Sequence, residues 1–200
     1  MPALITQKNV VWHDKIPLRF GFTGLSESDA TGIVKRIISE GFPSTVKYTE
    51  QCLYVVRLRG SVAVAYGEQF SPVLYIGEGN AKIRLRDHAA WLARLLLSVP
   101  NLEVEMHVAE VKRQNHTNLC EYVEADMIRW FREDYGYLPW FNQQREVSKE
   151  GCYQYEPEVE KKLRSLLGVG SGNAFIWAIR PTHNNEDAWV PFCKNSREPA

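Results

Sequence analysis

The sequence carries no excess of charge of either sign. Its 200 residues include 24 lysines and arginines and 24 aspartates and glutamates, which give a formal net charge of zero at pH 7. No global field therefore attracts a polyanion, and any affinity for nucleic acid has to come from a local basic patch.

Cysteines are few, and long apolar runs are missing. The four cysteines, Cys52, Cys120, Cys152 and Cys193, include no CxxC pair and no short spacing to histidine, so a structural zinc site is not expected. The first residues lack a basic segment followed by an apolar one, and no window approaches the roughly 18 apolar residues of a membrane helix. We therefore expect a cytoplasmic protein outside the membrane, with reduced thiols.

Apolar residues make up 44% of the chain, which is enough for one core. The first part, residues 1–48, is expected to be an accessory region with a short strand at 17–22 and a helix from about Ser26. Ser26 and Asp29 have the spacing of a helix cap, and Gly41 and Pro43 are typical of the end of a helix.

A change of pattern at Cys52 marks the start of the expected core domain, residues 49–145. Alternating or continuous apolar runs predict three strands, at 52–58, 73–79 and 102–111, and helical periodicity predicts helices at 81–97 and 118–134. Residues 146–200 form a C-terminal extension for substrate recognition or dimerisation, with a helix near 156–167 and a strand-like segment at 174–179. The fold class is α+β: a small, mainly antiparallel three-stranded sheet flanked by helices.

Glu124 is the residue that helical geometry singles out. At about 100° per residue, the helix at 118–134 places it inside an apolar arc that includes Ile128 and Phe131. A buried carboxylate requires a cation, a metal or several hydrogen-bond donors. The alternative is a glutamate at the helix edge that pairs with a nearby arginine or reaches water.

The preceding helix carries a second unusual pair. Arg84 and His88 share a ridge with Trp91 at the border of an apolar face. An arginine at such a border can present a planar fork of donors to a phosphate. The alternatives are an arginine whose stem covers apolar surface and a histidine with a structural role.

Together these segments resemble the GIY-YIG nuclease superfamily. The resemblance covers residues 52–142 and rests on five pieces in the family's order. They are CLY at 52–54, YIG at 75–77, Arg84 followed by His88 on the first helix, EADMI at 124–128, and LPWFN ending at Asn142. Each piece is weak by itself, and the specificity lies in their order on the appropriate strands and helices.

The resemblance implies a role for each matching residue. Glu124 would be the one carboxylate ligand of Mg²⁺ or Mn²⁺, with water completing the coordination, and Arg84 would contact the scissile phosphate. Tyr54 and Tyr75 would orient or deprotonate the attacking water, which for a tyrosine requires a cation that lowers its pKa. Asn142 would brace the site by hydrogen bonding. Tyrosines packed in a sheet and a turn-stabilising asparagine are the structural alternatives.

The chain also departs from the family pattern. Cys52 and Leu53 replace Gly-Ile in the first motif, and Glu78 follows YIG where many members have lysine. The two tyrosines are 75 − 54 = 21 residues apart, which predicts an inserted ribbon near the active face. Glu78 has three interpretations: it lowers the activity, it adds a second acidic ligand, or it marks a degenerate site.

The expected substrate is DNA, with RNA remaining open, and a homodimer is a possible arrangement. The candidates for binding nucleic acid are basic residues on the first helix and after the third strand: Lys82, Arg86, Arg94, Lys112 and Arg113. Three hypotheses follow: an active metal-dependent endonuclease; a catalytically impaired module that binds nucleic acid or protein; and an unrelated α+β protein with chance matches.

Overall fold

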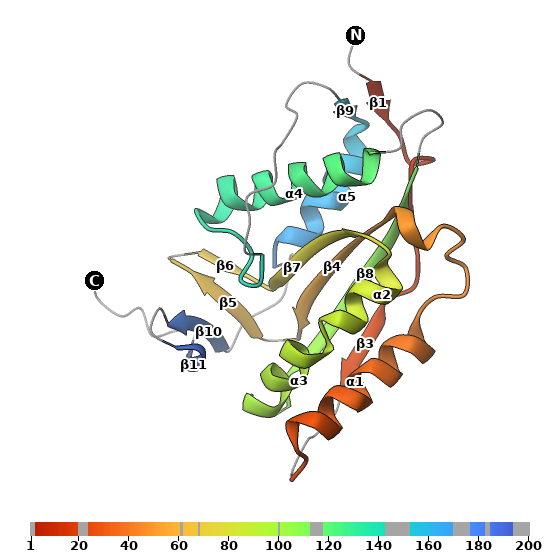
Figure 1. Ribbon diagram of the computed structural model, residues 1–200. Coiled ribbons are helices and arrows are strands. Elements are labelled where there is room, and N and C mark those ends of the chain that lie inside the picture. Colours follow the sequence, from red (N-terminus) through yellow and green to blue (C-terminus); the bar gives the residue numbers. More distant parts are fainter. Residues whose placement is uncertain are drawn as a thin grey trace.

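The structure is a computed structural model. It describes residues 3–19, 24–60, 62–67, 69–99, 101–112, 118–142, 153–169, 177–182 and 185–193. Its class is α+β with mostly antiparallel sheets, as expected (Figure 1). No helix in the described part of the chain is both long and apolar enough to cross a membrane.

The main sheet has five strands, so the expected number of three is wrong. Its strands are β2 (Val10–Trp12), β3 (Ile16–Arg19), β4 (Cys52–Arg59), β7 (Val73–Gly79) and β8 (Glu103–Val111). The order is β2-β8-β4-β7, and β3 also pairs with β8. The three predicted strands correspond to β4, β7 and β8. The other two come from the N-terminal region. The short strand expected at 17–22 corresponds to β3, and β2, with three residues, is too short to give a clear alternating pattern.

Two smaller sheets lie outside the main one. The first contains β5 (Val62–Tyr66), β6 (Gln69–Ser71), β10 (Trp177–Thr182) and β11 (Asn185–Cys193), in the order β11-β10-β5-β6. The second is a parallel pair of β1 (Ala3–Ile5) and β9 (Tyr153–Tyr155). Strands β5 and β6 form the ribbon that the long interval between the two tyrosines predicts.

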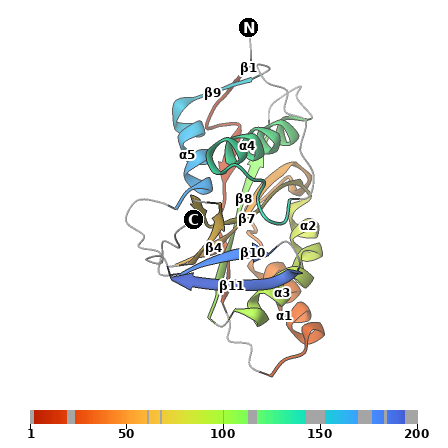
Figure 2. The same cartoon turned by 90° about the vertical axis from the view of Figure 1, so that its left-hand side faces the viewer.

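Helices cover both faces of the main sheet. They are α1 (Glu27–Gly41), α2 (Ala81–Asp87), α3 (Ala89–Ser98), α4 (Leu119–Tyr135) and α5 (Pro157–Leu167), and a short 3-10 helix, η1, spans Thr49–Gln51. Figure 2 shows α1, α2 and α3 on one side of the sheet and α5 on the other. Helix α4 packs mainly against β7, the strand at the edge of the sheet.

Local sequence signals fix the helix ends. Ser26 caps α1 by accepting a hydrogen bond from the backbone N–H of Asp29 at 3.2 Å, which confirms the predicted cap. The predicted single helix at 81–97 is instead two helices separated at His88. The His88 N–H bonds to the carbonyls of both Arg84 and Arg86 there, so the first helix closes before the second begins.

The N-terminal region contributes directly to the core, and substitution of Leu18 can test this contribution. Its side chain is fully buried on β3, so Leu18→Ala is expected to destabilise the whole domain by about 2–5 kcal/mol. Chemical denaturation followed by circular dichroism measures this change. The matched control is Leu25→Ala, because Leu25 is 38% exposed and its truncation is expected to cost less than about 1 kcal/mol. Equal, small effects would contradict the integration of β3 into the core.

Candidate functional site

Two tyrosines from adjacent strands lie against one glycine. Tyr54 on β4 pairs with Gly77 on β7, and Tyr75 lies two residues before Gly77 on the same face. The rings of Tyr54 and Tyr75 are nearly parallel, at 20°, with centroids 5.9 Å apart. A Cβ atom at position 77 would lie 2.5 Å from both rings. Glycine at this position therefore allows the two rings to come together.

His88 closes the same cluster from the junction of α2 and α3. Its Nε2 atom lies 3.5 Å from the Tyr54 hydroxyl, and its ring centroid lies 4.4 Å from that of Tyr75. Burial, aided by the positive charge of Arg84, lowers the pKa of His88 from 6.5 to about 4. The imidazole is therefore neutral at pH 7, and one of its ring nitrogens can accept a hydrogen bond.

Arg84 and Glu124 approach Tyr54 from two further elements. Coulombic attraction to Tyr54 raises the pKa of Arg84. Burial is the main cause of a raised Tyr54 pKa; Tyr75 and Glu124 raise this pKa further, and Arg84 opposes them. Tyr54 thus lies within electrostatic range of residues from α2, β7 and α4.

Glu124 faces the interior, as its position in the apolar arc predicts. It is 7% exposed on α4. Among the described residues, no group of three or more histidine, cysteine, aspartate and glutamate side chains could hold a metal ion.

Asn142 is fastened to the edge strand β7. Its Nδ2 donates to the carbonyl of Ile76 at 2.8 Å, and its Oδ1 accepts from the N–H of Ile76 at 3.0 Å. The N–H of Phe141 donates to the carbonyl of Leu74 at 3.0 Å. The segment ending at Asn142 thus completes hydrogen bonds that an edge strand leaves open, and it holds the strand that carries Tyr75.

Glu78 lies on the other face of the sheet from the tyrosine rings. It pairs with Leu53, one position along from the Tyr54–Gly77 pair, and successive residues of a strand point to opposite faces. Its charge contributes to a raised pKa of Cys120 on α4, after the larger effect of burial. Its replacement of lysine therefore does not insert a negative charge between the two rings.

The basic candidates with described positions lie on α2, on α3 and just after β8. Lys82 and Arg86 are exposed on α2, the helix that carries Arg84, and Lys82 Nζ lies 5.7 Å from the ring centroid of Phe42. Arg94 on α3 pairs with Glu27 of α1 at 3.2 Å. The other two candidates lie beyond the end of β8.

Lys112 follows the end of β8, with Nζ 3.7 Å from the carboxylate of Glu110 and 4.2 Å from the ring centroid of Tyr48. Arg113 falls outside the described residues. The structure therefore brings only Lys82 and Arg86 onto the same short helix as Arg84.

An aromatic stack beside the site could not be read from the sequence. Trp91 on α3 stacks on Phe141 with centroids 4.0 Å apart, and Trp140 stacks on the same ring at 4.8 Å. The Tyr66 hydroxyl of the inserted ribbon accepts a hydrogen bond from the N–H of Trp140 at 3.0 Å. These contacts join segments that are far apart in the chain, and together they position the residues that lead to Asn142.

Comparison of the chain with models of known protein families, with curated proteins and with solved structures gave no match. The interpretation of the site therefore rests on its own geometry and on the resemblance of its motifs.

Gly77 is the position at which the tyrosine geometry can be tested. Gly77→Ala would force both rings to move, with an expected loss of about 1–3 kcal/mol in the free energy of unfolding and a change in near-UV circular dichroism. Gly32→Ala on α1 is the control, because a Cβ atom there meets nothing within 4 Å. This control is expected to stabilise the helix by up to about 1 kcal/mol. A tolerated Gly77→Ala with an unchanged spectrum would contradict the close packing.

The lowered pKa of His88 predicts a dependence of stability on pH. Between pH 6.5 and about 4 the unfolded chain binds a proton that folded His88 does not, so acidification through this range favours unfolding. From pH 7 to pH 4, the wild type should lose up to about 3 kcal/mol more than His88→Gln. Urea unfolding at a series of pH values measures the difference, and parallel curves for the two proteins would contradict it.

Proposed function

We propose that the chain is a divalent-metal-dependent endonuclease of the GIY-YIG type that hydrolyses phosphodiester bonds in DNA. The surroundings of Tyr54 carry the proposal. Its hydroxyl lies 3.5 Å from Nε2 of His88, and its ring stacks with that of Tyr75. Its pKa also responds to the charges of Arg84 and Glu124. A cation, an imidazole, phenols and a carboxylate are groups that can serve phosphodiester hydrolysis.

Each residue has a role that follows from its surroundings. The Arg84 side chain is exposed to solvent, and its pKa is raised by Tyr54. It can therefore bind a phosphate oxygen and stabilise the charge of the transition state. Tyr54 is protonated at pH 7, since an ordinary tyrosine titrates near 10 and burial raises this pKa further; it therefore orients water as a hydrogen-bonding group. Neutral His88 can accept a hydrogen bond from that water or from the Tyr54 hydroxyl and hold it in place, while its lowered pKa makes it a weak base.

Glu124 is the residue that would hold the metal ion. A buried carboxylate and coordinated water suit Mg²⁺ or Mn²⁺. When bound, such an ion supplies positive charge that stabilises the leaving oxygen. Asn142 maintains the position of Tyr75 by its two hydrogen bonds to Ile76.

The test is cleavage of plasmid and single-stranded DNA with Mg²⁺ or Mn²⁺. Glu124→Gln keeps the shape of the side chain and removes its charge, so it is expected to lower the rate about a hundredfold or more, and chelation with EDTA should abolish cleavage. Glu121→Gln, an exposed position on the same helix, is the matched control and should retain full activity. A parallel RNA substrate identifies the preferred nucleic acid.

Two results would overturn this proposal. Equal cleavage by the wild type and Glu124→Gln would place the chemistry elsewhere. Binding of DNA by a folded wild type that never cuts it would support the alternative of a catalytically impaired binding module.

A further inference from the structure

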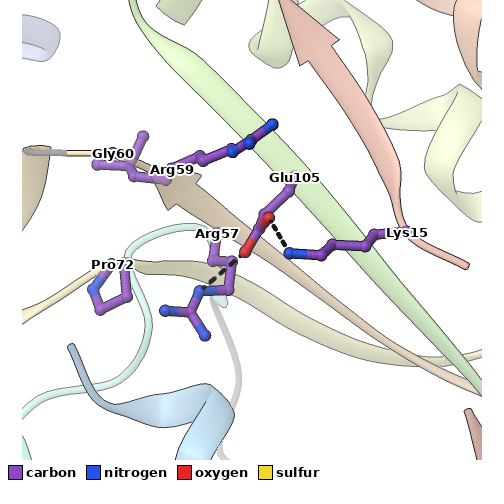
Figure 3. A pocket seen from close by; sticks show the side chains of 7 residues that line it. Lys15, Arg57, Arg59, Gly60, Pro72 and Glu105 are labelled. Carbon is purple, nitrogen blue, oxygen red and sulfur yellow. Dashed lines mark hydrogen bonds and ion pairs between the residues drawn. The ribbon is translucent and has the colours of Figure 1, made fainter. Parts of the chain in front are cut away.

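A second polar pocket lies on the face of the main sheet opposite the tyrosines. Along the regular pairing of β4 with β8, Tyr54 and Val56 occupy one face, and Arg57 and Arg59 occupy the other. The pocket has a volume of about 290 Å³. It is lined by Lys15, Arg57, Leu58, Arg59, Gly60, Pro72 and Glu105 (Figure 3).

The pocket is positively charged. Its lining contains three cations, Lys15, Arg57 and Arg59, and one carboxylate, Glu105, so its formal charge is 3 − 1 = +2. Including the neighbouring ion pair of Arg19 with Glu103 leaves this sum unchanged. In a chain with a formal net charge of zero, this is a local site for an anion.

Glu105 arranges the cations rather than filling the pocket. Its carboxylate is 2.9 Å from Lys15 Nζ, 3.0 Å from His107 Nε2 and 3.7 Å from Arg57 Nε. Hydrogen bonds from His107 and Lys15 outweigh the effect of burial and lower the pKa of Glu105 to about 2. The carboxylate is therefore ionised at pH 7, and it holds Lys15 and Arg57 on either side of it.

The two arginines retain unused hydrogen-bond donors. Within the described part of the chain, Arg57 makes one hydrogen bond, from Nη2 to the carbonyl of Gly168 at 3.2 Å; its buried Nε makes none and has Glu105 at ion-pair distance, 3.7 Å. Among the same residues, Arg59, which is 42% exposed, makes an ion pair with Glu103 at 3.7 Å. An oxyanion between these groups would accept hydrogen bonds from arginine N–H groups that have no protein acceptor among the described residues.

We propose that this pocket binds a phosphate monoester or inorganic phosphate. A phosphate with one ester bond or none carries a charge between −1.5 and −2 at pH 7, which matches the charge of the pocket, whereas the diester of a nucleic-acid backbone carries −1. The guanidinium fork of arginine also fits the oxygens of a phosphate. The source is a free phosphate compound or the terminal phosphate of a nucleic acid, and the second source rests on the proposed function.

The first experiment measures the binding of inorganic phosphate by calorimetry, with the amide resonance of Gly60 followed by NMR. Arg59→Gln and Lys15→Gln should each weaken binding about tenfold. Both side chains are more than 40% exposed, so neither change is expected to unfold the protein. Arg36→Gln, an exposed position on α1, is the matched control and should bind as the wild type does. Equal binding by all four proteins, or no binding by the wild type, would overturn the pocket.

The second experiment distinguishes the two sources. In EDTA, the affinity for one oligonucleotide is compared with and without a 5′-phosphate. A preference for the 5′-phosphate that Arg59→Gln abolishes assigns the pocket to a nucleic-acid end; no preference, with phosphate still bound, assigns it to a free phosphate compound.

Failure of the pocket and failure of the nuclease give different results. Arg59→Gln should cut a 5′-hydroxyl substrate at the wild-type rate with Mg²⁺, because Arg59 lies on the face opposite Tyr54. Phosphate binding without any cleavage would retain the pocket and reject the nuclease. Cleavage without phosphate binding would retain the nuclease and reject the phosphate pocket.

Discussion

The contact of the Tyr54 and Tyr75 rings with Gly77 is the constraint on which the candidate site depends. The pairing of β4 with β7 sets these three residues on one face, and only a residue without a side chain leaves room for both rings. With the rings in place, the Tyr54 hydroxyl meets His88, and the pKa of Tyr54 responds to Arg84 and Glu124. A small change in the separation of β4 and β7 would therefore move the two tyrosines relative to the other residues of the site.

Buried carboxylates in this protein are stabilised in different ways. Glu110 accepts hydrogen bonds from the backbone N–H groups of Lys47 and Tyr48, which lower its pKa despite the opposing effect of burial. Glu105 is stabilised by cationic side chains. Glu124 is 7% exposed, and its charge contributes to the raised pKa of Tyr54. The proposed function assigns the metal ion to Glu124, whereas the hydrogen bonds to Glu110 give that carboxylate a structural role.

Periodicity was enough to locate the elements of the core and the inward position of Glu124, because each depends on residues close in sequence. The break between α2 and α3 at His88, strand β2 and the place of β3 in the main sheet do not follow from such local patterns. The short strand expected at 17–22 corresponds to β3, which spans four residues and contains Pro17, and only its place in the main sheet is decided by pairing with β8. The stack of Trp91 on Phe141 likewise depends on a contact between segments 50 residues apart, which no local pattern encodes.

The charged residues of the pocket around Glu105 follow an alternating pattern in the sequence, but only the pairing of β4 with β8 shows that they lie together. Glu103 and Glu105 alternate with apolar residues on β8, and Arg57 and Arg59 alternate in the same way on β4. Antiparallel pairing sets Arg57 opposite Glu105 and Arg59 opposite Glu103, so two unremarkable patterns become one charged surface. Because residues alternate between faces, the same two strands present Tyr54 on one side and Arg57 on the other. The sheet thereby separates the candidate catalytic chemistry from the proposed anion site, and each can change without altering the other's side chains.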